Sequence, residues 1–267
     1  MLMKPKLKIY AALLVATIAL MVALGRCSRQ YASKEAQSSG GDTIDVAIEY
    51  SPLSLYMYAD TLGGFSHDLL NLIAKREHLH IKFHPMTSLD GSLKQLREGT
   101  VDIVAAQMPS TSDFKQQYLF TDAVAIDKQV LVQRRGKDGS VVVKSQLDLA
   151  GKTVCVANGS PVATRSANLA REIGDSIHVR TLDKSQEQLF LLVAAGDELY
   201  AVVSDNTARS LAVRYADIDV STAISFNQFQ AWAMAKNDTV LLQRMNKWLH
   251  NVRQTDEYKQ LRKRYNL

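Results

Sequence analysis

An alternation of β-rich runs and helix-periodic segments from Thr43 onward constrains the fold of this chain more than any other feature. Strands are predicted at IDVAIEY, IKFHP and VDIVAAQ, because these runs are apolar and rich in β-branched residues. Between the first two, GFSHDLLNLIAKRE carries Phe65, Leu69, Leu72 and Ile73 at helical spacing. Strands and helices that alternate in this way form a mostly parallel sheet with helices on its faces. The predicted fold class is therefore α/β.

One unit of this pattern occurs twice. A helix, a glycine and a strand follow one another in LKQLREGTVDIVAAQ and again in EQLFLLVAAGDELYAVVSD, and the second helix begins with a capping box of Ser185 and Gln188. We predict two lobes that share one plan, a first lobe from residues 43–130 and 224–267 and a second lobe from residues 131–223. A chain that crosses between its lobes twice suits hinge closure over a cleft.

The first 26 residues are predicted to be a signal peptide or a membrane anchor. Three lysines precede an apolar run from Ile9 to Gly25, which is the order of a secretory signal, and the length of the run is also at the short limit for a membrane span. Leu24, Gly25 and Cys27 resemble the lipobox of bacterial lipoproteins, in which the cysteine carries lipid, whereas Arg26 departs from it. Cys27 is the predicted lipidation site, and a retained anchor is the alternative.

Residues 27–42 are predicted to be a flexible tether, because SRQYASKEAQSSGGD is rich in Ser, Gly, Ala and Gln and has no apolar period. The formal net charge of +5 comes largely from the segment before Cys27, which holds four of the 32 lysines and arginines and none of the 27 acids. The remainder is nearly neutral, which argues against nucleic-acid binding. We expect a protein of the periplasm or cell envelope that is tethered to the membrane. Cys155, in KTVCVA, is predicted to be a buried core residue.

Several motifs follow one another in a fixed order along residues 43–267, namely IDVAIEYSPL, GGFSHDLLNLIAKRE, LREGTVDIVAAQM, FTDA, LDLAGKTVCVANGSP and YAVVSD. Their order and spacing resemble those of family 3 extracellular solute-binding proteins, the amino-acid-type periplasmic binding proteins of ABC transporters. The binding module of membrane-bound lytic transglycosylase F is similar, and there a separate catalytic domain follows. The resemblance implies a two-lobed periplasmic-binding-protein fold of type II, a small-molecule ligand, and a partner that is an ABC permease or a membrane receptor.

The resemblance also implies a ligand cleft at the carboxyl ends of the strands, where open α/β sheets bind their ligands. Gln107 and Asp205 occupy equivalent places in the two repeated units. Asp205 would accept hydrogen bonds from a ligand ammonium, or else cap the following helix. Tyr50 aligns with the stacking residue of the family. The predicted ligand-binding residues are Tyr50, Ser51, Gln107, Met108, Ser110, Thr111, Phe114, Gly159, Ser160, Arg165 and Asp205.

Two departures from the family pattern bear on the ligand. Phe114 stands where the amino-acid binders carry an arginine that clamps the ligand carboxylate. Pro161 removes one N–H donor from a strand-to-helix turn that would otherwise face an anion. Arg165, about one helical turn further on, could substitute from the second lobe. We therefore expect a peptide-like, cell-wall-derived or uncharged aromatic ligand rather than a simple α-amino acid.

The alternative function is a cell-wall-associated accessory protein or a small cleft enzyme of the dehydratase type, with Asp205 or Glu49 as its acid. Transglycosylase activity is not expected, because the required acid belongs to a separate helical domain and this chain ends with the binding module. Asp68, on the polar side of its helix, is interpreted as a structural or capping acid rather than a ligand. No cofactor and no metal site are predicted, and a monomer is expected.

Overall fold

The computed structural model describes residues 43–51, 53–265 and 267. The signal or anchor segment, Cys27 and the tether up to residue 42 lie outside these residues, so what the sequence predicts for them stays a prediction. Among the described residues, no helix combines the length and the apolar content needed to cross a lipid bilayer.

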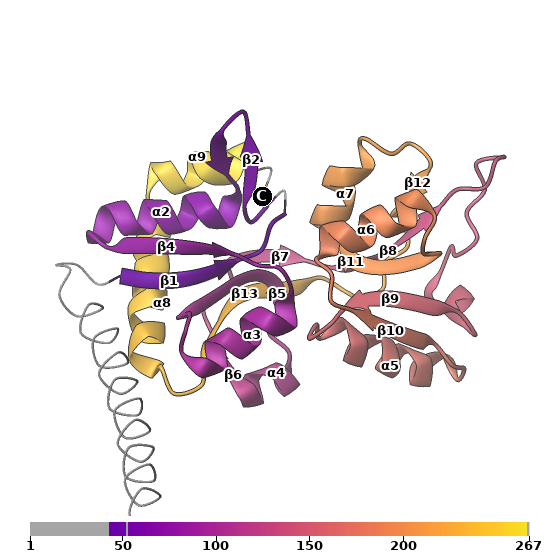
Figure 1. Ribbon diagram of the computed structural model, residues 1–267, viewed down its shortest axis with the longest axis horizontal. Coiled ribbons are helices and arrows are strands. Elements are labelled where there is room, and N and C mark those ends of the chain that lie inside the picture. The colour runs from indigo at the N-terminus through magenta and orange to yellow at the C-terminus, as the bar shows by residue number, and fades with distance from the viewer. Residues whose placement is uncertain (1–42, 52, 266) are drawn as a thin grey trace, which may run out of the picture. The chain divides into compact units, whose positions relative to one another are not determined.

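The first of two large sheets takes its strands from both ends of the described chain (Figure 1). Its order is β4-β1-β5-β13-β6, with β7 also paired to β13. Parallel pairing joins β1 to β5, whereas β13 runs antiparallel to β5, β6 and β7. The strand bounds are β1 Thr43–Ile48, β4 His80–Pro85, β5 Ile103–Pro109, β6 Tyr118–Phe120, β7 Ala125–Asp127 and β13 Gln228–Ala235. We call this sheet and the helices of its part of the chain the first lobe.

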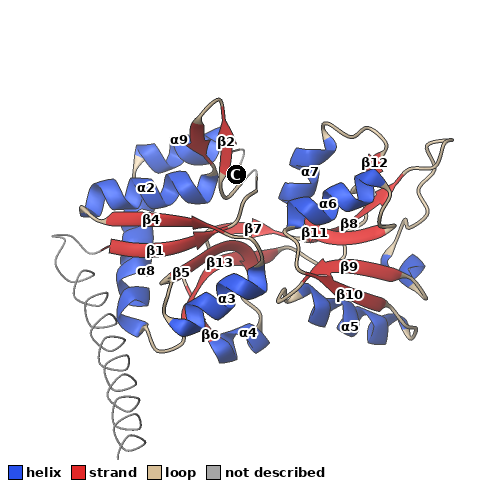
Figure 2. Ribbon diagram, in the orientation of Figure 1, coloured by secondary structure: helices blue, strands red, loops and turns tan. Residues whose placement is uncertain are grey.

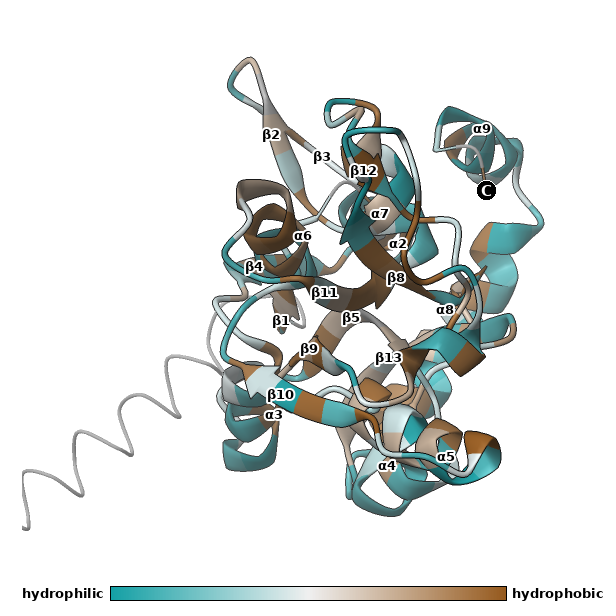
Figure 3. Cartoon of the chain, turned by 90° about the vertical axis from the view of Figure 1, so that its right-hand side faces the viewer, coloured by the Kyte–Doolittle hydropathy of each residue, from teal (hydrophilic) through white to brown (hydrophobic). Residues whose placement is uncertain are grey.

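The second sheet has the order β10-β9-β11-β8-β12. β9 is parallel to β10 and β11, whereas β8 is antiparallel to β11 and β12. β11 and the middle of β8 are hydrophobic (Figure 3), and in β8 only the last residue is exposed. The strand bounds are β8 Gln129–Arg134, β9 Thr153–Ala157, β10 His178–Leu182, β11 Tyr200–Ser204 and β12 Ile218–Asp219. We call this sheet and its helices the second lobe.

Helices flank both sheets, as Figure 2 shows, and this confirms the predicted α/β class. The first lobe contains α2 Phe65–Glu77, α3 Leu89–Glu98, α4 Ser112–Gln117, α8 Thr239–Arg253 and α9 Asp256–Arg264. The second lobe contains the 3-10 turn η1 Gln146–Leu149, α5 Val162–Ile173, α6 Gln186–Ala195 and α7 Asp205–Ala212. A short hairpin of β2 Tyr56–Tyr58 and β3 Thr61–Gly63 precedes α2.

The repeated unit of helix, glycine and strand is present in both lobes. α3 ends at Gly99 and α6 ends at Gly196, both in the left-handed conformation (φ 71° and 91°) that glycine adopts without a steric cost. β5 follows the first glycine and β11 the second. The predicted capping box is confirmed, since the Ser185 hydroxyl accepts from the Gln188 N–H and the Gln188 side chain accepts from the Ser185 N–H. Local chemistry therefore begins and ends these helices as the sequence indicates.

Each lobe has its own buried core. Trp232 of β13 lies fully buried in the first lobe, and Phe190 of α6 lies fully buried in the second. Burying one such aromatic side chain contributes about 2–3 kcal/mol, so each core holds its helices to its sheet. Cys155 also belongs to the second core, as predicted; its Sγ donates to Glu198 at 3.2 Å, and burial raises the pKa of the thiol.

The chain passes between the two sheets twice. The first passage is at Lys128, between β7 and β8, and the second lies between β12 and β13. The second passage is hydrogen-bonded to the start of β8, directly after the first passage, because Leu131 N donates to Thr222 O and Ile224 N donates to Gln129 O, both at 2.8 Å. A pair of joined segments therefore connects the lobes.

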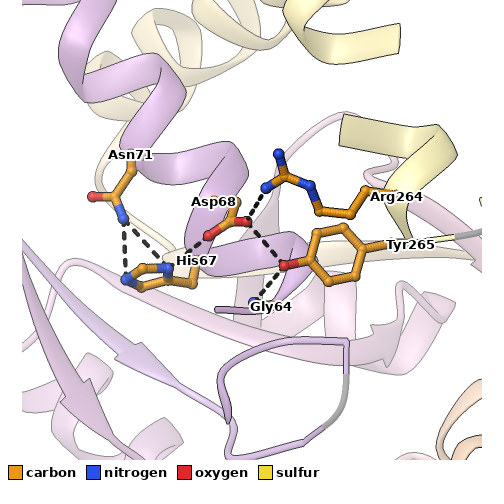
Figure 4. A network of polar contacts seen from close by, with 6 residues as sticks. All are labelled: Gly64, His67, Asp68, Asn71, Arg264 and Tyr265. Carbon is orange, nitrogen blue, oxygen red and sulfur yellow. Dashed lines mark hydrogen bonds and ion pairs between the residues drawn. The ribbon is translucent and has the colours of Figure 1, made fainter. Parts of the chain in front are cut away.

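Asp68 ties the C-terminal helix to the start of α2 (Figure 4). Its Oδ2 accepts from the Tyr265 hydroxyl at 2.9 Å and pairs with Arg264 at 3.3 Å. The same hydroxyl accepts from Gly64 N at 2.7 Å. Burial, together with the neighbouring carboxylate, raises the pKa of Tyr265, which keeps the hydroxyl able to donate. Asp68 is thus a structural acid, as the sequence indicates.

Candidate functional site

A cavity lies between the two lobes. Sixteen of the described residues line it, eight from each lobe, and it encloses about 560 Å³ of empty space, open solvent included. Eight of the sixteen are apolar, which is typical of a small-molecule site. Its charged lining residues are Glu49 and Lys184. Its neutral polar lining residues are Thr87, Ser88, Gln129, Ser160, Ser185 and Gln186.

Strand ends and helix starts bring these side chains together. Glu49 follows β1, Met108 lies near the end of β5, and Ala157 ends β9. Ser88 caps α3 in the first lobe and Ser185 caps α6 in the second, so the repeated unit contributes the same helix position from each lobe. The cavity thus lies where open α/β sheets place their ligands.

Gln186 links the two lobes across this cavity. Its Nε2 donates to Glu49 Oε1 of the first lobe at 3.2 Å, and its Oε1 accepts from Ser204 N of the second lobe at 2.6 Å. Glu49 is only 6% exposed, so its carboxylate depends on such partners for the hydrogen bonds that water would otherwise make. The link orients a buried carboxylate inside the cavity.

The lobes also approach one another at Gly159. This residue has a φ of +75°, and a Cβ placed on it would lie 3.0 Å from the Cα of Asp90 in α3. Both the backbone conformation and the contact favour glycine at this position. The turn after β9 therefore abuts the start of α3.

Gln129 lies at the point where the first passage enters the second lobe. It is the first residue of β8, lines the cavity and is 3% exposed. Its N–H donates to Ser225 Oγ at 2.9 Å, so its backbone is fixed by the second passage. Gln129 therefore belongs to the wall of the cavity at the junction of the lobes.

Asp127, two residues earlier, is a buried acid beside the passage. It is 5% exposed, its Oδ1 accepts from Lys128 N at 2.8 Å, and its Oδ2 has no hydrogen-bond partner in the described part of the chain. Burial outweighs the bond from Lys128 and raises the pKa of Asp127 to about 6. At neutral pH the charged carboxylate therefore costs free energy.

Several predicted ligand-binding residues lie at or near the cavity. Met108 and Ser160 line it, and Gly159 makes the contact with Asp90. Gln107 lies in β5, but its side chain is outside what the structure describes. The remaining residues of the predicted set are not among the described residues that line the cavity.

In the first lobe, the predicted ligand-binding residues after β1 and β5 do not line the cavity. Tyr50 is 43% exposed, and the buried Ser51 hydroxyl accepts from Ser54 N at 3.2 Å. Thr111 caps the short helix α4, of which Phe114 is part. Phe114 packs against the first-lobe core, with its ring centroid 6.1 Å from that of Tyr118, while Ser110 lies half-buried just before the cap.

In the second lobe, two predicted charged residues are engaged in ion pairs. Arg165 pairs with Glu172 at 2.7 Å and donates from Nε to Ile224 O at 3.3 Å. Asp205 pairs with Arg209 at 2.7 Å and stands 4.0 Å from Lys128. The N-cap of α7 is Ser204, whose hydroxyl accepts from the Thr207 N–H. The alternative that Asp205 caps this helix is therefore wrong. The ligand role of Asp205 stays a prediction.

The two lobes, the paired passages and the cavity define a periplasmic-binding-protein fold of type II, as predicted. Among solved structures, an ancestral arginine-binding protein bound to arginine matches with a TM-score of 0.72 at 25% identity, covering 84% of this chain and 97% of that one. The substrate binding protein of an amino acid ABC transporter matches with a TM-score of 0.71 at 22% identity, covering 84% and 98%.

The chain belongs to the bacterial extracellular solute-binding proteins, family 3, whose family model matches residues 43–267. A "Membrane-bound lytic murein transglycosylase F" from Alteromonas mediterranea is 27% identical over 200 residues, which cover 72% of this chain and 42% of that protein. A "Probable histidine-binding protein" from Campylobacter jejuni is 24% identical over 244 residues, which cover 88% and 89%. The chain spans less than half the length of the transglycosylases that it matches.

Proposed function

We propose that this chain is an extracytoplasmic solute-binding protein that captures a small ligand by closing its two lobes. The observation that carries this proposal is the cavity, which takes eight lining residues from each lobe and is bridged by Gln186. A ligand held in such a cavity contacts both lobes at once, so it favours the arrangement in which they meet. Binding rather than turnover is the proposed role.

The proposed role continues outside the cavity. A lipid on Cys27, or a retained anchor in residues 1–26, would tether the protein to the membrane on the periplasmic side, with residues 27–42 as the tether. The monomer would deliver its ligand to an ABC permease or report it to a membrane receptor. The family membership supports the transport role, since solute binding is what the family description names.

The proposed ligand is a peptide-like, cell-wall-derived or uncharged aromatic molecule. Phe114 packs on the first-lobe core, and among the described residues no arginine lines the cavity. The buried Glu49 carboxylate would repel a ligand carboxylate near it, because a buried charge is poorly screened. Free α-amino acids therefore lack the bidentate partner that they need.

This proposal is tested by mass spectrometry of protein purified from its native host, followed by calorimetric titration with the co-purified ligand and with free amino acids. We expect the co-purified ligand to bind with micromolar or tighter affinity and glutamate and glutamine to bind more weakly than that. Glu49→Gln should change the affinity, whereas Glu98→Gln, at an exposed acid of α3, should leave it unaltered. Micromolar binding of glutamate or glutamine would contradict the ligand class.

A small cleft enzyme is the second candidate, and the buried Glu49 in the cavity is the observation that favours it. A carboxyl group in a cavity of this kind can act as a general acid or base. Turnover of a cyclic acid or of a muropeptide by the purified chain, lost in Glu49→Gln and retained in Glu98→Gln, would support the enzyme. Retention of the ligand without turnover supports the binding protein.

A further inference from the structure

Gln129 is a polar residue in the wall of the interlobe cavity. It is 3% exposed, yet among the described residues its side chain has no hydrogen-bond partner. The backbone of the same residue is fully used, because its N–H donates to Ser225 Oγ and its carbonyl accepts from Ile224 N at 2.8 Å. The backbone of Gln129 is therefore held in place by bonds that leave its side-chain amide available to a ligand.

An amide in this position is most fully satisfied by another amide. A carboxamide offers two N–H donors and one accepting oxygen. A ligand carboxylate would satisfy the donors and face the oxygen with like charge, whereas an ammonium would satisfy the oxygen alone. A second carboxamide forms both bonds side by side, so it pairs the donors and the oxygen at once.

The charges of the cavity also favour a neutral group. Glu49 is its acid and Lys184 its base among the described lining residues, so the wall has no net charge. Glu49 is already bonded to Gln186 at 3.2 Å. A ligand carboxylate would need a cationic fork to replace its hydration, and the described wall offers none.

We infer that the cavity takes a ligand with a neutral carboxamide, either a primary amide or a lactam, that pairs with Gln129. The inference rests on the proposed function and narrows its ligand class. An ordinary trans peptide bond directs its N–H and C=O to opposite sides, so it makes one of the two bonds at a time. Primary amides and lactams direct both groups to the same side and make both bonds.

The test compares L-alaninamide with its N-methylamide and with L-alanine in calorimetric titrations. We expect the wild-type chain to bind L-alaninamide about tenfold more tightly than the N-methylamide, because the methyl group removes the second bond, and more tightly than L-alanine. Gln129→Met and Gln129→Glu should each weaken the binding of L-alaninamide about tenfold and remove its advantage over the N-methylamide. The glutamate variant preserves the side-chain shape, so it tests the chemistry even where the methionine variant folds poorly.

Gln230→Met is the matched control. Gln230 is 1% exposed and also has an unpaired amide oxygen, but it does not belong to the described lining of the cavity. The variant should therefore bind all three probes as the wild type does. Equal binding of L-alaninamide and its N-methylamide by the wild type, or unchanged binding by both Gln129 variants, would overturn the inference.

The same experiment separates this inference from the proposed function. A co-purified ligand that lacks a carboxamide and binds equally well to wild type and Gln129→Met would overturn the inference and leave a solute-binding protein. If neither co-purification nor the probes gave any bound small molecule, the proposed function and the inference would both be contradicted.

Discussion

A single buried carboxyl group makes the stability of this protein depend on pH. Asp127 ends β7 beside the first passage, and its pKa is raised from 3.8 to about 6, chiefly by burial. A raised pKa means that the folded chain binds the proton more tightly than the unfolded chain does. The resulting stabilisation is complete below about pH 4 and is lost as the pH rises through 6.

We therefore compare the change in the free energy of unfolding that Asp127→Asn causes at two pH values. This change should be more stabilising at pH 7.5 than at pH 4 by roughly 3 kcal/mol. The asparagine can still accept the Lys128 N–H and has no charge to bury. Urea unfolding of both proteins at the two pH values measures the difference. For Asp256→Asn we expect the opposite pH dependence, a more destabilising effect at pH 7.5 than at pH 4. The reason is that the bond from Lys259 lowers the pKa of the exposed Asp256 carboxyl. Equal effects of Asp127→Asn at both pH values would contradict this account.

At the same scale, only part of the cavity wall could be expected from the sequence. Met108 and Ser160 line it, and both lie at strand ends that the alternating pattern locates. Gln129 and Gln186 were missed as wall residues, because their position depends on how two lobes meet. From the sequence, Glu49 is predicted only as a possible acid of the enzyme alternative. The repeated unit could have indicated Gln186. It directly follows Ser185, the N-cap of α6, which is equivalent to Ser88, the N-cap of α3.

Among the elements, the end of α9 and the start of α2 share one hydroxyl, that of Tyr265, which bonds both Gly64 and Asp68. Tyr265→Phe would leave Gly64 N–H and Asp68 without their shared partner in a partly buried site (Figure 4). We expect the free energy of unfolding to fall by about 1–3 kcal/mol and hydrogen exchange to rise first in α9. Tyr215→Phe preserves the ring packing on Phe190 and should change little. Unaltered exchange in α9 would show that the hydroxyl is dispensable.

Element patterns differ in how far a sequence reveals them. The repeated helices and the glycines that end them depend on local sequence, so their positions along the chain can be predicted. α4 was not, because six residues, Ser112–Gln117, are too few to show a helical period and the helix relies on the Thr111 cap. The antiparallel placement of β8 and β13 is not evident from the sequence, since the pairing joins residues 67–75 positions apart for β8 with β11 and 121–131 positions apart for β13 with β5.

At the scale of the whole molecule, the proposed lobe closure would rely on the close approach of Gly159 to Asp90. Gly159→Ala would add a Cβ 3.0 Å from the Asp90 Cα, in addition to a left-handed backbone that costs about 1 kcal/mol. We expect about tenfold weaker binding of the co-purified ligand, because the added atom opposes the arrangement in which the lobes meet. Calorimetric titration measures the loss.

Gly174→Ala separates the two effects. Gly174 has a nearly identical φ of +72°, and a Cβ there would meet nothing within 4 Å. This variant should lose similar stability in urea and bind the ligand as the wild type does. Equal affinities for the two variants would mean that the contact with Asp90 has no part in closure.

The paired passages have a consequence for how such a protein can change over evolutionary time. Because Gln129 and Ile224 are hydrogen-bonded neighbours, the whole second lobe enters and leaves the first through adjacent points. A segment with adjoining ends can be exchanged as a cassette without unfolding its host, as domain insertions generally require. One half of the cavity wall could thus be replaced in a single recombination while the other half, with its own core, is inherited unchanged.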